Sequence, residues 1–265
     1  MAGLDELLYK ADSYKAEIDK KRPFKDIDSL KKLQDFYRVD FTYTSNALEG
    51  NSLSLSETKV ILEDGITVGG KPLKDIYEAV GHALAYDYMF SLVQRDYISV
   101  IDICKMHELF YSMIDSCNAG KLRKENVYIS GSRNNDKIPE HVNLPAEMGK
   151  LEGWLREDHE KIHPVLFAAE LHVKLIQIHP FIDGNGRICR LVMNMALVQN
   201  GYPPAIIPPV IRAEYIETLE SSWINSQPFY KFIAQQVIET EKDLMRMLRI
   251  PLDANGNSRG SARFY

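Results

Sequence analysis

The chain has 265 residues, 45% of them hydrophobic, which suits one large globular domain or a core with attached helices. Its formal net charge of −5 at pH 7 excludes the basic surface by which proteins bind nucleic acids in general. The three cysteines, Cys104, Cys117 and Cys189, are too few and too scattered for a disulfide framework or a zinc cluster.

The N-terminal region, residues 1–95, is expected to be helical. Apolar residues recur at helical spacing from residue 4 to 20, Pro23 closes that region, and a second helix is expected over about 27–45. A serine-led helix start follows near residue 54, a Gly- and Pro-rich loop over 65–75, and a long helix from Asp75. There is no apolar signal core and no stretch of 18 apolar residues, so we expect a cytoplasmic protein with no membrane partner.

The middle of the chain changes character twice. A helix is expected over about 100–113; its His107-Glu108 pair begins like a zinc-protease helix, but Tyr111 stands where the second histidine is needed, which excludes that site. Residues 120–143 are rich in glycine and asparagine, and the alternation around residues 126–130 predicts a short β-hairpin. Helices follow from Pro145 and from Pro164, the second so apolar that it should be the buried central helix, with His172 in the core.

The most informative stretch is His179 to Arg190, which reads HPFIDGNGRICR. Gly184 and Gly186 allow positive φ, so successive N–H groups can point inward and form an anion nest. A helix should begin near Arg187, and its unpaired first amides and positive dipole end add to that anion site. Arg187 and Arg190 are three residues apart, so they share a helical face and offer planar sets of donors to phosphate oxygens.

The same stretch supplies a metal ligand and a base. Asp183 is a hard oxygen ligand able to hold a Mg²⁺ that bridges phosphates. His179 is the titratable base suited to work near neutral pH. A calcium loop is excluded, because the fifth position counted from Asp183 is Arg187 and not an oxygen ligand. Together these residues predict chemistry on a phosphate compound.

This stretch resembles the signature of the Fic family, H-x-F-x-[D/E]-G-N-G-R-x-x-R, at every defined position. The family consists mostly of adenylyltransferases, which move AMP from ATP to a hydroxyl of a protein. The resemblance implies an all-α Fic fold, with a helical core around the signature loop and one small β-hairpin flap. It divides the chain into an N-terminal region (1–95), a catalytic core (96–205) with the flap at about 120–143, C-terminal helices (206–250) and a flexible tail (251–265).

The resemblance also assigns roles. It makes His179 the general base that deprotonates the target hydroxyl and Asp183 the Mg²⁺ ligand. The phosphates of the substrate ATP would be held by Gly184, Asn185, Gly186, Arg187 and Arg190. Candidates for clamping the target on the flap are Tyr128, Ile129 and Ile138, and candidates for contact with adenine are Tyr215 and Asn225.

A second stretch, Ser45 to Glu49 and Gly50, resembles the family's inhibitory motif [S/T]-x-x-x-E-[G/N]. Without that context it is a helix end followed by a capped helix start, with Glu49 in solvent. The resemblance implies instead that an inhibitory helix precedes the core in the same chain. Glu49 would then pair with Arg190 and take the place that the γ-phosphate needs.

The expected partner is a target protein with a Ser, Thr or Tyr hydroxyl, with the chain itself among the candidates. Neither nucleic acid nor membrane is expected, and the sequence is compatible with a homo-oligomer. Two alternatives stay open at this stage. One is a Fic-type enzyme that removes AMP, with Glu49 positioning a water; the other is a nucleotide-binding regulatory protein without turnover.

Overall fold

The computed structural model describes residues 3–21 and 27–252, which form α-helices joined by turns and contain no β-strand. In chain order the α-helices are α1 (Leu4–Lys21), α2 (Ile27–Ala47), α3 (Leu55–Lys59), α4 (Leu73–Ser91), α5 (Val100–Tyr111), α6 (Leu144–Asp158), α7 (Pro164–Ile178), α8 (Asn185–Gln199), α9 (Arg212–Ser221) and α10 (Gln227–Met247). The predicted all-α class is therefore confirmed for these residues. Most of the predicted tail, residues 253–265, and Pro23 lie outside them.

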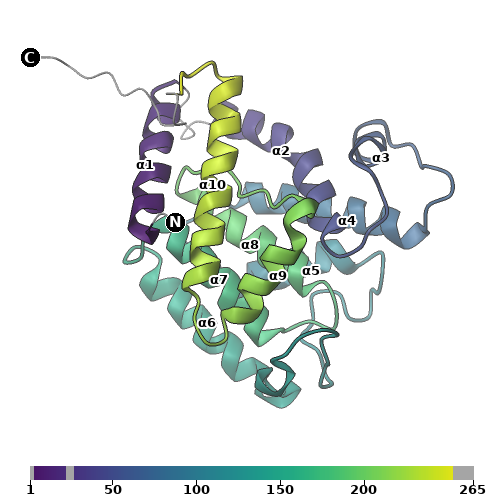
Figure 1. The fold of residues 1–265 in the computed structure, drawn as a ribbon. Coiled ribbons are helices and arrows are strands. Elements are labelled where there is room, and N and C mark those ends of the chain that lie inside the picture. Colours follow the sequence, from purple (N-terminus) through teal and green to yellow (C-terminus); the bar gives the residue numbers. More distant parts are fainter. Residues whose placement is uncertain (1–2, 22–26, 253–265) are drawn as a thin grey trace, which may run out of the picture.

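The pair α7 and α8 forms the centre of the molecule, with the other helices around it (Figure 1). The ring of His163 caps α7 by accepting the Val165 N–H, and Pro164 occupies the first turn, where its missing N–H costs nothing. Side chains of α7 and α8 are buried along most of both helices, which confirms the predicted central helix. On one side α10 packs against α7, and α1 lies alongside α10.

The N-terminal region reaches the centre through α2. This helix packs on α4, where Arg38 and Asp87 form a bidentate ion pair, with Nε–Oδ1 and NH2–Oδ2 both at 2.9 Å. Its last turn contacts α8. The turn after α2 ends at Gly50, whose φ of +90° is a left-handed conformation that favours glycine. This arrangement carries Ser45 and Glu49 to the beginning of α8.

The predicted β-hairpin at about 120–143 is wrong. This segment, called the flap below, is irregular and contains two short 3₁₀ turns, Asn135–Lys137 and His141–Asn143. The reason lies in one side chain. Asn135 accepts the N–H of Ile129 through Oδ1 at 2.7 Å and donates to the carbonyls of Ile129 and Ser132 at 2.9 and 3.0 Å. A side-chain amide therefore takes the place of the strand partner that a hairpin would supply.

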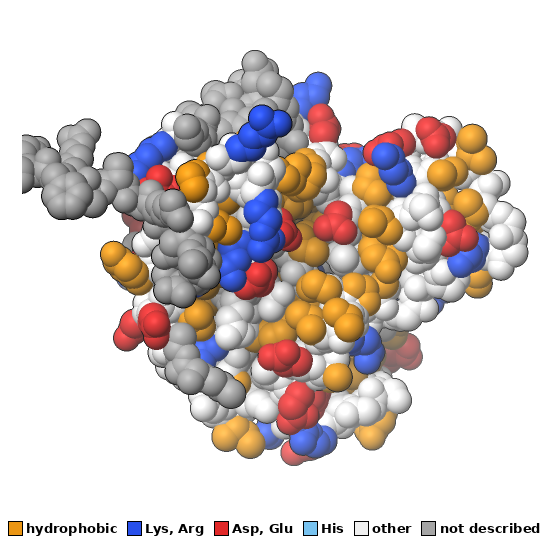
Figure 2. All heavy atoms as spheres, turned by 45° about the horizontal axis from the view of Figure 1, so that its top comes forward, with side chains coloured by type: hydrophobic (Ala, Val, Ile, Leu, Met, Phe, Trp, Pro, Cys, Tyr) orange, Lys and Arg blue, Asp and Glu red, His pale blue; other side chains and the backbone are white. Residues whose placement is uncertain are grey.

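The surface mixes charges of both signs. On the face in Figure 2, Lys and Arg side chains lie among Asp and Glu, and hydrophobic side chains gather in small groups between them. Among the described helices, none is long and apolar enough to cross a membrane.

Candidate active site

The turn from His179 to Gly184 joins α7 to α8 in a fixed shape. His179 has φ 49°, and its N–H, bonded to the Leu175 carbonyl at 3.0 Å, closes α7. Gly184 has φ 79°, and a Cβ there would lie 2.7 Å from the ring of Phe110, so only glycine fits. Asn185 braces the turn from inside, since its amide accepts the N–H of Phe181 at 3.0 Å and donates to the Phe181 carbonyl at 2.8 Å.

His107 on α5 holds the same turn from the core. Its ring is parallel to that of Phe181, with centroids 3.8 Å apart. Nδ1 accepts the N–H of Gly120 at 2.9 Å, and Nε2 lies 3.1 Å from the carbonyl oxygen of Asp183. Since Gly120 only donates and the carbonyl only accepts, these partners fix the neutral tautomer with its proton on Nε2. His107 was not predicted from the sequence, where it belongs only to the incomplete zinc pattern that was excluded.

Arg123 connects the flap to the carbonyl of His179. Its Nε donates to that carbonyl at 2.9 Å, while NH1 and NH2 donate to the carbonyls of Glu125 and Pro139 at 2.9 and 2.6 Å. Its own N–H bonds to the carbonyl of Pro180 at 2.9 Å. The side chain is almost fully buried, and among the described residues it forms no ion pair. Both ends of the flap are thus tied to the turn that carries His179.

The imidazole of His179 is neutral in this structure. Its pKa is lowered to about 4, chiefly by burial, and the nearby charge of Arg123 acts in the same direction. The Ile176 carbonyl and the negative charges of Asp183 and Glu49 act in the opposite direction without offsetting the burial. At pH 7 the ring can therefore accept a proton, as a general base must.

The first turn of α8 contains the residues that the sequence predicted to bind an anion. Its first backbone N–H groups have no partner within the helix, and the dipole is positive there. Arg187 is buried, pairs with Glu78 of α4 through NH1 at 2.9 Å, and has its guanidinium 4.6 Å from the ring centre of Phe110. Asp183 accepts the Gly184 N–H through Oδ1 at 2.6 Å, while its side chain is 45% exposed. Glu78 was not predicted as a site residue, because nothing in the sequence distinguishes it from other helical glutamates.

Arg190 binds the inhibitory motif with three of its donors. NH2 lies 2.7 Å from Oε1 of Glu49 and donates to the Ser45 carbonyl at 2.8 Å, and Nε donates to Ser45 Oγ at 3.0 Å. The guanidinium is 1% exposed and the Glu49 side chain 35%. Burial opposes ionisation of Glu49, but the charges of Arg190, Arg187 and Arg212 outweigh it and hold the pKa of that carboxyl below its usual value.

The carboxylate of Glu49 also lies over the start of α8. A Cβ on Gly186 would fall 2.3 Å from Glu49 Oε1. A negatively charged group of this chain thus occupies the position where the sequence predicted an anion nest. Arg212 of α9 fixes the turn from the other side by donating from Nε to the Leu48 carbonyl at 2.6 Å.

Tyr215 lies beneath Arg190 in the core. Its hydroxyl is 3.2 Å from Arg190 NH1 and 2.9 Å from His172 Nε2, and its ring packs beside Phe229 and Phe232. Burial raises its pKa to about 12, so the hydroxyl stays protonated. The structure therefore does not place this ring, selected from the sequence as an adenine contact, on an open face.

A sequence model described as the Fic/DOC family matches residues 97–197, which run from just before α5 to near the end of α8. The chain belongs to the Fic/DOC family. The match contains the signature turn, His107, Arg123 and the flap, while the inhibitory motif at Ser45–Glu49 precedes it.

The Fic/DOC assignment agrees with two kinds of relatives. The chain is 40% identical over 205 residues to "Protein adenylyltransferase Fic" of Drosophila persimilis, which covers 76% of this chain and 39% of the relative. Fic-1 of C. elegans superposes with a TM-score of 0.82 at 27% identity, covering 93% of this chain and 73% of that one. A Fic domain containing signaling protein from Bacteroides thetaiotaomicron gives 0.79 at 26% identity, covering 91% and 97%. The chain thus spans about two fifths of the curated relative's length.

The remaining residues selected from the sequence lie at the edge of this Fic/DOC site. Tyr128 on the flap is 79% exposed, whereas Ile129 and Ile138 are half-buried. Asn225 lies in the exposed turn between α9 and α10, where its Oδ1 accepts the Gln227 N–H at 3.1 Å. The tip of the flap docks on α9, where the Arg133 guanidinium lies 3.0 Å from Glu217.

Proposed function

We propose that this chain is a protein adenylyltransferase that moves AMP from ATP to a hydroxyl of a target protein and is restrained by Glu49. The observation that carries the proposal is the position of the Glu49 carboxylate, which lies over Gly186 and on Arg190 at the start of α8. The chain thereby holds a negative charge in an anion site beside a neutral histidine. The name printed for the Drosophila relative supports AMP transfer as the reaction.

The proposed reaction is a single displacement at the α-phosphorus. His179 takes the proton of the target hydroxyl, whose oxygen forms a bond to the α-phosphorus while the bond to the bridging oxygen of the β-phosphate breaks. Pyrophosphate leaves, and the proton stays on the imidazole until solvent removes it. A pKa of about 4 leaves the imidazole unprotonated at pH 7, so it is able to take this proton.

In this proposal the phosphates lie on the first turn of α8. The backbone N–H groups of Asn185 and Gly186 would bind the anion, with Arg187 and Arg190 as the charged donors. The N–H of Gly184 would join them only on leaving Asp183 Oδ1, to which it is bonded in this structure. The side chain of Asn185 contributes only indirectly, since both of its ends are bonded to Phe181. Tyr215 supports Arg190 from below, and a contact of Tyr215 or Asn225 with adenine remains a proposal.

The residues at the turn fit a Mg²⁺ ion brought with ATP. Asp183 uses Oδ1 for the Gly184 N–H, and Oδ2 of its half-exposed side chain lies 4.0 Å from Nζ of the exposed Lys74, a contact that a bound metal ion would replace. Among the described residues no group of three or more metal-binding side chains exists. Mg²⁺ in nucleotide sites commonly uses one or two carboxylates together with phosphate oxygens and water, so Asp183 suffices on the protein side. When bound, the ion would supply positive charge to the phosphates.

The proposed restraint is a competition for Arg190. The γ-phosphate and the Glu49 carboxylate both require the same guanidinium, and two negative groups cannot share it. A closed state favoured by a few kcal/mol leaves roughly 0.1–10% of the molecules competent. Low basal activity is the expected consequence.

The proposed target carries a Ser, Thr or Tyr hydroxyl, and the flap would align it, with Tyr128, Ile129 and Ile138 as the side chains in reach. The chain itself is one candidate target. We keep the cytoplasm as the proposed compartment, supported by three cysteines that are all free in the structure.

The test is transfer of α-labelled ATP to protein in cell lysate. Wild type, Glu49→Gly, Glu49→Gln and Glu49→Gly/His179→Ala are compared. Strong labelling by both single variants, little by wild type and none by the double variant is expected. The Gln variant is the matched control, since it keeps the size of the side chain and removes only its charge.

A second assay in the same experiment presents protein that already carries labelled AMP. Release of that label by wild type and its loss in Glu49→Gly would instead assign removal of AMP. Nucleotide binding without labelling or release in any variant would contradict both reactions.

A further inference from the structure

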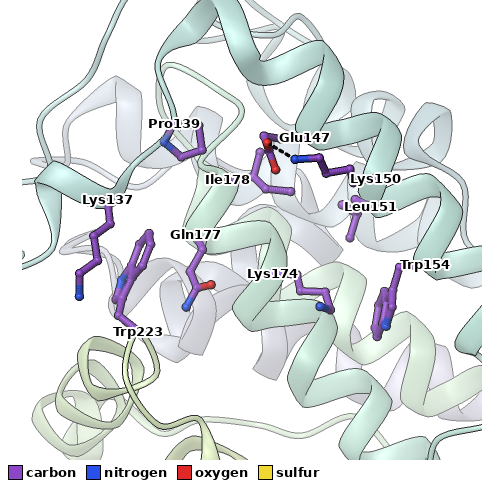
Figure 3. Close-up of a pocket in the computed structure, with 10 residues that line it drawn as sticks. All are labelled: Lys137, Pro139, Glu147, Lys150, Leu151, Trp154, Lys174, Gln177, Ile178 and Trp223. Atoms are coloured by element: carbon purple, nitrogen blue, oxygen red, sulfur yellow. Dashed lines mark hydrogen bonds and ion pairs between the residues drawn. The ribbon is translucent and has the colours of Figure 1, made fainter.

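A second pocket lies behind the flap. Its volume is about 340 Å³, and it is bounded by α6, the outer face of α7, the end of the flap and the turn after α9 (Figure 3). The residues that line it are Lys137, Pro139, Glu147, Lys150, Leu151, Trp154, Lys174, Gln177, Ile178 and Trp223. None of them belongs to the proposed nucleotide site.

Half of the residues that line the pocket are apolar or aromatic. The chain has two tryptophans, and both line this pocket, at opposite ends of it (Figure 3). Trp154 is fixed by stacking on Phe167, with centroids 4.6 Å apart, and both indoles are half-buried. Half-buried tryptophans beside a hollow are the side chains that most often anchor a binding partner.

Its charge is positive, in contrast to the net charge of the chain. Three lysines line the pocket against one carboxylate, Glu147. Lys150 pairs with that carboxylate at 2.7 Å, and Lys174 pairs with Glu170 at 3.1 Å. Lys137 differs, because it donates to the neutral amide oxygen of Asn134 at 2.8 Å and forms no ion pair among the described residues. One lysine is thus left without a negative partner.

The pocket is connected to His179 by short, defined links. Ile178 in its wall is the residue before His179. Pro139, which also lines the pocket, accepts through its carbonyl from Arg123 at 2.6 Å, and Arg123 donates to the carbonyl of His179 at 2.9 Å. A segment held in the pocket would therefore have a fixed position relative to the reacting hydroxyl.

We infer that this pocket binds the target protein beside its modified hydroxyl, and that it takes an apolar side chain followed by an acidic one. The apolar side chain lies between the indoles, and the acidic one pairs with Lys137. The inference rests on the proposed function. If the flap aligns the target by pairing with its backbone, that contact is the same for every target sequence. The pocket would add specificity, because it contacts side chains of the target.

Charge complementarity and location favour a protein segment over a free nucleotide. The proposed nucleotide site offers paired arginines and helix N–H groups to phosphates, whereas the pocket offers separate lysines, two of which already have carboxylate partners. Its remaining charge is suited to a single carboxylate. Its volume suits one or two side chains.

The test uses the two tryptophans as the probe. Ten-residue peptides with Leu-Glu-Thr at the centre, and the same peptides with Leu-Lys-Thr, are titrated into the full chain without ATP while tryptophan emission is recorded. Neither peptide contains an aromatic residue, so the emission reports the pocket alone. We expect a saturable change with the Glu peptide, weakened by salt, and at least about tenfold weaker binding of the Lys peptide.

Variants of two flap lysines complete the test. Lys137→Glu should weaken binding of the Glu peptide at least about tenfold, and Lys137→Arg should not. Lys124→Glu is the matched control, because Lys124 is exposed and outside the pocket while the change in net charge is the same. Equal binding of both peptides, equal effects of Lys124→Glu and Lys137→Glu, or saturation by ATP and by neither peptide would overturn the inference. This test measures binding and not transfer, so its outcome is independent of the labelling test of the proposed function. Peptide binding by a chain that labels no protein in that other test would contradict the proposed function and leave the pocket standing.

Discussion

The carboxylate of Glu49 lies 2.7 Å from the guanidinium of Arg190, across 141 residues of sequence. The pair sits at the positive end of α8, where an anion is stabilised by the helix dipole and by unpaired N–H groups. Under the proposed function, the segment Ser45–Glu49 would do more than cover the site, because Glu49 presents a charge of the same sign as the phosphates of ATP to the donors that would bind them. Any weakening of this contact should be visible as activity.

Substituting Ser45→Ala should release part of the restraint. It removes the acceptor of Arg190 Nε and leaves the Ser45 carbonyl and Glu49 in place. A hydrogen bond to a charged group contributes about 1.5–3 kcal/mol, so the closed state should lose population. We expect transfer of labelled AMP at least about tenfold above wild type and no greater than in Glu49→Gly. Ser112→Ala, at an exposed position, is the control. A folded Ser45→Ala variant with wild-type activity would show that this bond does not hold the closed state.

The variant Gly186→Ala should distinguish the effect of displacing Glu49 from the effect of blocking the phosphate position. The added Cβ would lie 2.3 Å from Glu49 Oε1 and 3.2 Å from Arg190 NH1. The flexible carboxylate can move away, but the methyl stays where a phosphate would bind. In a Glu49→Gly background we therefore expect Gly186→Ala to weaken ATP binding about tenfold, measured by calorimetry, since overpacking costs about 1–3 kcal/mol. Gly149→Ala on α6, where a Cβ meets no atom within 4 Å, should change nothing. Equal ATP affinity with and without the methyl would move the phosphates away from Gly186.

Arg123 should position both His179 and the flap. Lys at this site keeps the charge but cannot supply the planar set of donors that reaches three carbonyls, and Gln keeps neither. We expect both variants to raise KM for the target protein and lower kcat while the affinity for ATP is unchanged.

The pH profile distinguishes the two variants of Arg123. Its charge lowers the pKa of His179, so Arg123→Gln should move the acid limb of the rate profile to higher pH and Arg123→Lys should not. Identical profiles for both variants, with lower activity, would reduce Arg123 to a structural role.

The parts of the candidate site that could be predicted from the sequence are formed by residues close together along the chain. The positive φ of Gly184, the arginines on one face of α8, and the spacing of Ser45 and Glu49 are local patterns. Their local geometry follows from helix periodicity and glycine conformations. The positive φ expected at Gly186 is not found, because that residue lies inside α8. The contact between Glu49 and Arg190 is long-range, and it was expected only because a family resemblance joined the two motifs.

The residues that could not be predicted act across the fold. His107, Arg123 and Glu78 each touch the site from another element, and nothing in their neighbours along the chain marks the contact. The prediction of a β-hairpin in the flap was wrong for a different reason. Alternation around Tyr128 indicates a strand, but Asn135 satisfies the Ile129 backbone by itself, and a side-chain bond of this kind competes with strand pairing.

Buried histidines should make the fold sensitive to acid. Burial holds the pKa of His172 at about 3 and of His107 at about 4, against a usual 6.5, and lowers that of His82 as well. As pH falls below 6.5, these histidines bind protons in the unfolded chain but not in the folded chain. Their contribution to the free energy of unfolding is therefore fully present above pH 6.5 and is lost towards pH 4. Glu241 acts oppositely, because burial raises its pKa and the folded chain keeps that proton as pH rises above 4.5.

His172→Gln tests this balance, since glutamine can still bond to the Tyr215 hydroxyl and cannot be protonated. Between pH 6.5 and 4 the free energy of unfolding, measured with urea, should fall less steeply than in wild type, by about 1.4 kcal/mol per pH unit for the one proton removed. Glu241→Gln is the opposite control and should gain more stability at pH 7 than at pH 4. Parallel curves for wild type and His172→Gln would mean that His172 is already charged in the folded chain. Arg190 beside it makes that state unfavourable, because both cations would share the Tyr215 hydroxyl.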